Sequence, residues 1–151
     1  MRKGATAVET THDEAGVLRF VIRLLIKHPS IDPGSVTAEL GLQPRVTHLV
    51  GAGRMTPAGA PLSGVYKESM WGWSERIERK RAFFEAVAEL VHKLESHAPF
   101  ISDLIHGGGS VEMIVHLPGD INIGSVLPWT EMKKLAELRV DLGIEVFPRF
   151  D

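Results

Sequence analysis

The sequence contains no cysteine. This absence excludes disulfides, zinc–thiolate sites, iron–sulfur clusters and thiol catalysis. No stretch approaches the roughly 20 apolar residues of a membrane-spanning helix, and residues 1–16 lack the apolar core of a signal peptide. We therefore expect a cytoplasmic protein without a membrane span, in which residues 1–15 are a flexible polar leader and residues 16–151 form a single domain.

Excess positive charge and nucleotide-binding motifs are also missing. The formal net charge is −2, whereas nucleic-acid binders usually carry a basic excess. The glycines of residues 51–53 lack the third glycine and the following helix of a dinucleotide fingerprint, and Gly107–Gly109 is expected to follow a helix rather than precede one. No serine lies in a nucleophile elbow. The sequence thus indicates no cofactor, metal or catalytic residue, makes nucleic acid an unexpected partner, and favours a non-enzyme.

The first regular pattern present is an alternation over Leu18–Lys27. Its apolar residues fall on one face and Arg19, Arg23 and Lys27 on the other, which predicts a strand with one solvated face. Asp32 then caps a short helix that has Pro33 in its first turn, and Gly41 ends it in a left-handed conformation.

Further elements follow from local patterns. Residues 51–64, rich in glycine and proline, predict a loop. We then expect a strand at Val65–Trp73, a long helix at Ser74–Ser96 and a second short helix at Phe100–Ile105. A hairpin of Val111–Leu117 with Ile121–Ile123 should follow. The last elements are expected to be a helix capped by Thr130 and ended by Gly143, and a strand at Ile144–Phe147; the inner face of this helix carries Met132, Leu135, Leu138 and Leu142. This order predicts an α+β two-layer sandwich, with an antiparallel or mixed sheet of five to six strands, two larger helices and one short helix.

A helix-turn-helix beginning at Asp32 is the main alternative for the first third of the chain. Such a motif needs a preceding helix and a reading helix rich in phosphate-binding cations. Here a strand precedes Asp32, and the segment after Pro44 reaches Gly51 in less than two turns with Arg45 as its only basic residue. We therefore predict a second strand over residues 45–51.

The residues that precede, begin and end the short helix resemble those of a known family. Leu18-Arg19-Phe20, His28–Pro33, Val36-Thr37 and Leu40–Pro44 resemble the opening of the bacterial family catalogued as domain of unknown function 4279. A tryptophan before a long helix and a closing helix that ends in Leu-Gly-apolar extend the resemblance from residue 17 over nearly the whole chain. The resemblance implies a small bacterial protein without an established activity or defined catalytic residues. The loop at 51–64 is longer than the family's usual connection.

Candidate functional residues gather in and around that loop. Tyr66, Trp71 and Trp73, with Arg54 and His48, form an expected recognition surface, because Tyr, Trp and Arg dominate the energetic centres of interfaces. Each tryptophan could instead cover the edge of the core. Our leading hypothesis is a non-catalytic interaction protein, with a neutralising (immunity-type) protein as one form.

Two other functions stay open. A small-ligand binder or sensor would have an apolar pocket between the sheet and the long helix. A hydrolase-like enzyme would need His48 or His116 beside a carboxylate in a cleft. Glu89 and His92 are three residues apart, a spacing found in some metal bundles, but a surface salt bridge explains them better. An unpaired edge strand leaves a homodimer open.

Overall fold

A computed structural model describes residues 19–78 and 82–148. Its main sheet has five strands in the order β2-β5-β1-β6-β7, and a separate two-stranded sheet pairs β3 with β4. The strands are β1 Arg19–His28, β2 Val46–His48, β3 Gly53–Met55, β4 Pro61–Val65, β5 Ser69–Glu78, β6 Ser110–Pro118 and β7 Val140–Phe147. The helices are α1 Pro33–Leu40, α2 Phe83–Glu95, α3 Ala98–His106 and α4 Trp129–Leu138.

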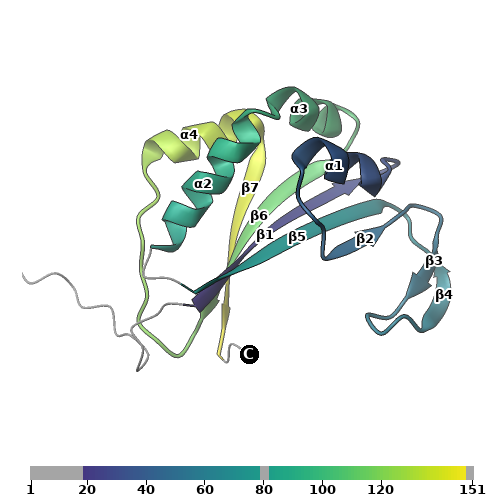
Figure 1. Ribbon diagram of the computed structural model, residues 1–151, viewed down its shortest axis with the longest axis horizontal. Helices are drawn as coiled ribbons and strands as arrows, with labels where there is room; N and C mark the ends of the chain where they lie inside the picture. The colour runs from purple at the N-terminus through teal and green to yellow at the C-terminus, as the bar shows by residue number, and fades with distance from the viewer. Residues whose placement is uncertain (1–18, 79–81, 149–151) are drawn as a thin grey trace, which may run out of the picture.

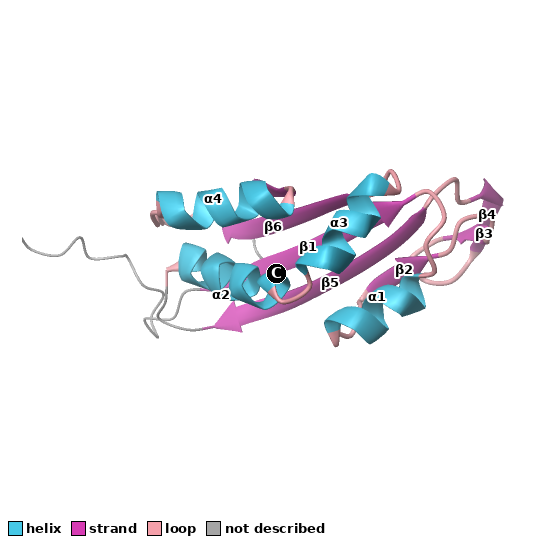
Figure 2. Ribbon diagram, turned by 90° about the horizontal axis from the view of Figure 1, so that it is seen from above, coloured by secondary structure: helices cyan, strands magenta, loops and turns pink. Residues whose placement is uncertain are grey.

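The helices lie over one face of the main sheet (Figures 1 and 2). Strand β7 runs parallel to β6, and the other neighbours in the main sheet are antiparallel. The predicted α+β class with a mixed five-stranded sheet is therefore confirmed. The described residues contain four helices: two larger ones, the short α1, and α3, which confirms the second short helix predicted at Phe100–Ile105. No helix within these residues is long and apolar enough to cross a membrane. The expected leader, residues 1–15, lies outside them.

Strand β1 occupies the centre of the sheet, as its alternating sequence requires. Phe20, Ile22, Leu24 and Ile26 are at most 2% exposed and face the helices. Because β5 and β6 pair with β1 on either side, both edges of β1 are hydrogen-bonded within the sheet. The predicted strand is confirmed.

The segment that follows β1 also forms as predicted. The Asp32 carboxylate accepts a hydrogen bond from the Gly34 amide at 2.9 Å, and Gly41 ends α1 with φ of 67°. Residues 46–48 then form β2 rather than a reading helix. This order rules out a helix-turn-helix here.

The long predicted helix begins too early. Residues 74–78 continue β5, which pairs with β1 from Ser69 to Glu78, and α2 starts only at Phe83. Ile77 fits both a helical and a strand period. The ten-residue pairing with β1, which no local pattern reports, decides in favour of the strand.

The expected hairpin of Val111–Leu117 with Ile121–Ile123 is also wrong. Strand β6 forms as predicted, but β1 pairs with one of its edges and β7 with the other. No edge of β6 therefore remains for residues 121–123, which are not a strand.

The last helix is displaced at both ends. It begins at Trp129 after Pro128 rather than at a Thr130 cap, and it ends at Leu138, followed by Arg139 as the C-cap with φ of 57°. Gly143 is not a helix stop, because it lies within β7 opposite Ile114 of β6. Leu142 therefore belongs to this strand. Residues 140–143 follow the parallel pairing with β6 in place of the helical period of Met132, Leu135 and Leu138.

Candidate binding surfaces

The region expected to be a loop is an ordered β-hairpin. Residues Leu49–Tyr66, here called the arm, contain β3 and β4 and project beyond the β2 edge of the sheet (Figures 1 and 2). The Thr56 amide donates to the Ala60 carbonyl at 2.8 Å and closes the turn, where Gly59 has φ of 85°. The glycine-rich composition that predicted a loop thus allows a tight hairpin turn.

Polar contacts hold the base of the arm. The Gly51 amide donates to the Tyr66 carbonyl at 2.8 Å, and the Tyr66 amide donates to the Ala52 carbonyl at 3.0 Å. The Tyr66 ring stacks on His48 with centroids 3.9 Å apart, and its hydroxyl accepts from the Met55 amide at 3.2 Å. These contacts orient the arm relative to the sheet, so Tyr66 and His48 act first as its anchors.

The arm exposes an unusual share of large apolar side chains. Leu49, Met55, Leu62 and Val65 are 49%, 57%, 45% and 53% exposed. Arg54 is the only charged residue between Leu49 and Tyr66, and its guanidinium donates to the Ser63 carbonyl at 3.4 Å. Single exposed apolar residues are ordinary, but such a group on one projecting element is typical of an interaction site.

Trp71 is not part of an exposed surface. Its side chain is fully buried, and its Nε1 donates to Thr37 Oγ1 of α1 at 3.0 Å. Trp71 pairs with Ile26 and Trp73 with Leu24, so both rings emerge on the helix-covered side of the sheet. The expectation of an exposed patch around both tryptophans is therefore wrong for Trp71, which belongs to the core.

Trp73 is half-buried and lines a groove between the sheet and α2. The groove has a volume of about 530 Å³ and an apolar floor. This floor is formed by Ile22, Trp73, Ile77, Ala86 and Leu90. Charged residues, among them Glu75 and Lys93, form its rim, so it is amphipathic rather than purely apolar. The structure thus brings Arg54, Tyr66 and His48 together at the arm and places Trp73 at a separate site.

The histidines lie outside this groove. His116 Nδ1 is 3.6 Å from Glu145 Oε2 of β7, and its ring stacks on Phe147 at 5.4 Å. His116 Nε2 is buried without a hydrogen-bond partner in the described part of the chain. His92 lies 3.8 Å from Glu95. Within residues 19–78 and 82–148, no group of three acidic or histidine side chains could hold a metal ion.

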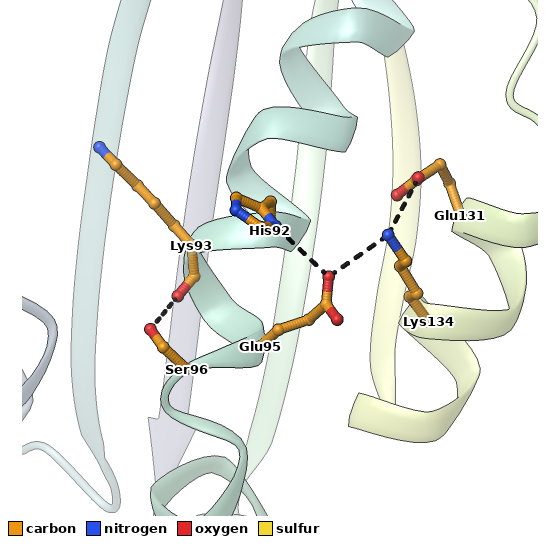
Figure 3. A network of polar contacts seen from close by, with 6 residues as sticks. All are labelled: His92, Lys93, Glu95, Ser96, Glu131 and Lys134. Atoms are coloured by element: carbon orange, nitrogen blue, oxygen red, sulfur yellow. Dashed lines mark hydrogen bonds and ion pairs between the residues drawn. The ribbon is translucent and has the colours of Figure 1, made fainter.

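A polar network joins α2 to α4. Lys134 Nζ lies 3.3 Å from Glu131 and 3.4 Å from Glu95, which also contacts His92 (Figure 3). The hydrogen bond to Glu131 raises the pKa of Lys134 above 10.5, and the charges of Glu131 and Glu95 add to this, while desolvation opposes it. The Lys134–Glu95 ion pair thus connects α4 to α2, and none of these four side chains lines the groove or belongs to the arm.

Sequence reasoning missed the third tryptophan. Trp129 is 71% exposed at the start of α4, with Val126 at 85% and Met132 at 50%. Met132 was expected on the inner face, but the buried positions of α4 are Leu135 and Leu138. The available signal was Pro128, which fits the position just before a helix and would have moved the start of α4 to Trp129.

These features define a small α+β protein with two candidate binding surfaces, the arm and the groove. The model of the family described as "Domain of unknown function (DUF4279)" matches residues 19–147, and the chain belongs to this family. The resemblance noted in the sequence is thereby confirmed. Comparison with curated proteins and with solved structures gave no match.

Proposed function

We propose that this protein is a non-catalytic binding protein of the bacterial cytoplasm that docks onto a partner protein through the arm. A neutralising, immunity-type protein is one form of this function. The observation that carries the proposal is the exposure of Leu49, Met55, Leu62 and Val65 on a projecting hairpin. A cysteine-free chain, independent of an oxidising compartment, supports the cytoplasmic location.

The order of the arm supports a docking role. Its turn and base are held by backbone hydrogen bonds and by the Tyr66–His48 stack. A preorganised element loses less conformational entropy on association than a flexible loop does, and more of its apolar contact therefore becomes affinity. Arg54 adds a cation that can pair at the rim of such an interface.

An enzymatic function has weaker support. His97 lies 3.1 Å from the Glu39 carboxylate and His116 lies 3.6 Å from that of Glu145, but no histidine lines the groove. His48 stacks on Tyr66, and no carboxylate contact of its ring is found in the described residues. A histidine needs both a positioned partner and a cleft for general acid–base chemistry.

The test compares two variants of the full chain as matched baits. Leu62→Ser with Val65→Ser removes apolar surface from the arm, whereas Val126→Ser with Met132→Ser removes exposed apolar surface near α4. A bacterial protein captured by the wild type is purified, and its affinity for all three proteins is measured by titration calorimetry. We expect the arm variant to bind at least roughly tenfold more weakly, the loss typical of interface hot spots, and the α4 variant to bind like the wild type.

Equal binding by the arm variant and the wild type would refute the docking role. Light scattering after gel filtration then measures the oligomeric state of the wild type and of the arm variant. If the wild type is a dimer and the arm variant a monomer, the arm joins two copies of this chain rather than a different protein, and the proposal of a separate partner fails.

A further inference from the structure

The groove between β5 and α2 is a second candidate binding site, separate from the arm. Strand β5 contributes Trp73, Glu75 and Ile77 together with Arg76 and Glu78, which pair with each other, and α2 contributes Ala86, Glu89, Leu90 and Lys93. Helix α2 follows β5 in the chain and runs back along it (Figures 1 and 2). Ala86 therefore lies toward the Ile77 end of the groove and Lys93 toward the Trp73 end.

Two opposite charges at this groove have no partner among the described residues. Glu75 pairs with Ile22 across the sheet, so its carboxylate emerges on the helix-covered side, at the groove. Lys93 extends from α2 on the side away from Glu95 and Lys134 (Figure 3). No ion pair or side-chain hydrogen bond within residues 19–78 and 82–148 engages the carboxylate of Glu75 or the ammonium of Lys93.

The groove therefore complements a ligand that carries both charges. Its apolar floor accepts a hydrophobic side chain, Lys93 attracts an anion at one end, and Glu75 attracts a cation farther along. Lys93 lies toward the Trp73 end, and the two-residue step from Trp73 to Glu75 along β5 spans about 7 Å at about 3.4 Å per residue. The first and last Cα atoms of an extended peptide of three residues are separated by about the same distance.

We propose that the groove binds a short zwitterionic peptide of about three residues. Its carboxylate lies beside Lys93, its amino group beside Glu75, and an apolar side chain packs on Trp73 and Ile77. The volume of about 530 Å³ is within the range of about 300–1,000 Å³ usual for small-ligand sites. Binding weakens with added salt, because both contacts at the rim are solvent-exposed.

The experiment is a calorimetric titration of the full chain with the tripeptide Ala-Leu-Ala. The matched ligand is N-acetyl-Ala-Leu-Ala-amide, which lacks both charges. The variants Glu75→Gln and Lys93→Gln each remove one groove charge, and Lys133→Gln removes another exposed cation, which pairs with Glu137 on α4. All substituted residues are exposed, so thermal unfolding of the variants is expected to match that of the wild type.

We expect saturable binding of Ala-Leu-Ala to the wild type and to Lys133→Gln. Glu75→Gln and Lys93→Gln should each weaken it roughly fivefold, as for an exposed ion pair. The blocked peptide should bind more weakly than Ala-Leu-Ala and be insensitive to either groove variant. The tripeptide should shift the Trp73 indole resonance, identified from its loss in Trp73→Phe.

Absence of saturable binding, equal binding of the blocked peptide, or equal effects of Lys93→Gln and Lys133→Gln would each overturn the proposal. The arm variant separates this result from the proposed function. Leu62→Ser with Val65→Ser should bind Ala-Leu-Ala like the wild type, because the arm contributes no residue to the groove.

Discussion

Trp71 and Trp73 lie two residues apart on the same face of β5 and have different environments. Trp71 is fully buried under α1, where Thr37 accepts its indole N–H, whereas Trp73 is half-buried at the groove. Their local sequences could not separate these outcomes, because the difference arises from which helix lies above each ring. Only the ring at the groove remains available to a ligand.

The Trp71–Thr37 contact leads to a prediction about stability. Thr37→Val leaves the buried indole N–H without an acceptor and should lower the free energy of unfolding by about 1–3 kcal/mol. In combination with Trp71→Phe, the two losses should be less than additive, because the hydrogen bond can be lost only once. Urea unfolding of both single variants and the double variant measures this.

Trp73→Phe provides the matched control for that cycle. Its effect should add to that of Thr37→Val, since Trp73 does not contact Thr37 by any hydrogen bond in the described residues. Strict additivity for the Trp71 pair would contradict the structural role assigned to this hydrogen bond.

The raised pKa of Lys134 predicts how stability responds to alkaline pH. A lysine whose pKa is higher in the folded state binds its proton more tightly there, so its stabilising contribution is complete below 10.5 and is lost as pH rises through the folded-state pKa. We expect the unfolding free energy of Lys134→Gln to fall less steeply than that of the wild type between about pH 9 and about pH 12.

Lys134→Arg is the control in this comparison, because arginine keeps the charge and does not titrate in this range. Its alkaline slope should resemble that of Lys134→Gln, while its stability near neutral pH should be closer to that of the wild type. Identical slopes for the wild type and Lys134→Gln would show that the network of Figure 3 does not hold this proton.

At the level of elements, substitutions of two strand glycines, Gly72 in β5 and Gly143 in β7, test where these strands lie. A Cβ at Gly143 would lie 3.6 Å from Ile114 Cγ1, an ordinary contact, whereas a Cβ at Gly72 would lie 2.9 Å from Val46 Cγ1. We predict that Gly143→Ala changes the unfolding free energy by at most about 0.5 kcal/mol and that Gly72→Ala lowers it by about 1–3 kcal/mol. Chemical denaturation of both variants provides the measurement.

The outcome for Gly143 tests the topology directly. If Gly143 were a left-handed helix stop, as its sequence context suggests, its substitution by alanine would lower the free energy of unfolding by about 1–2 kcal/mol. A loss of that size would contradict its place in β7, parallel to β6.

The elements predictable from sequence are those specified by neighbouring residues. The alternation of β1, the Asp32 cap and the Gly41 stop are local signals, and each produced the expected structure. Residues 74–78 and 140–143 carry helical periodicity but pair as strands, because β1 and β6 offer them edges. Pairing of this kind depends on residues distant in the chain, which local periodicity does not report.

The candidate sites also combine features that the local sequence predicts with features that depend on distant parts of the chain. Arg54, Tyr66 and His48 were expected at a recognition surface, and the structure places them together at the arm. The exposure of Leu62 and Val65 was not predicted, because it depends on the arm projecting away from the sheet. The groove charges Glu75 and Lys93 were likewise hidden, since the sequence assigned both to one helix.

At the scale of the whole molecule, the two candidate surfaces are separate. The arm lies beyond β2 at one end of the sheet, and α2 lies over its other half (Figure 1). A partner protein could therefore occupy the arm while the groove stays open, and variants of one surface should leave the other intact. This separation allows the proposed protein contact and the proposed peptide site to be tested independently.

Amide hydrogen exchange of the full chain, with and without the protein that it captures, tests the proposed docking role of the arm most directly. We predict that protection on binding concentrates in residues 49–66 and leaves α4 unchanged. Protection of α4 around Trp129, with none in the arm, would contradict the claim that the arm is the docking element.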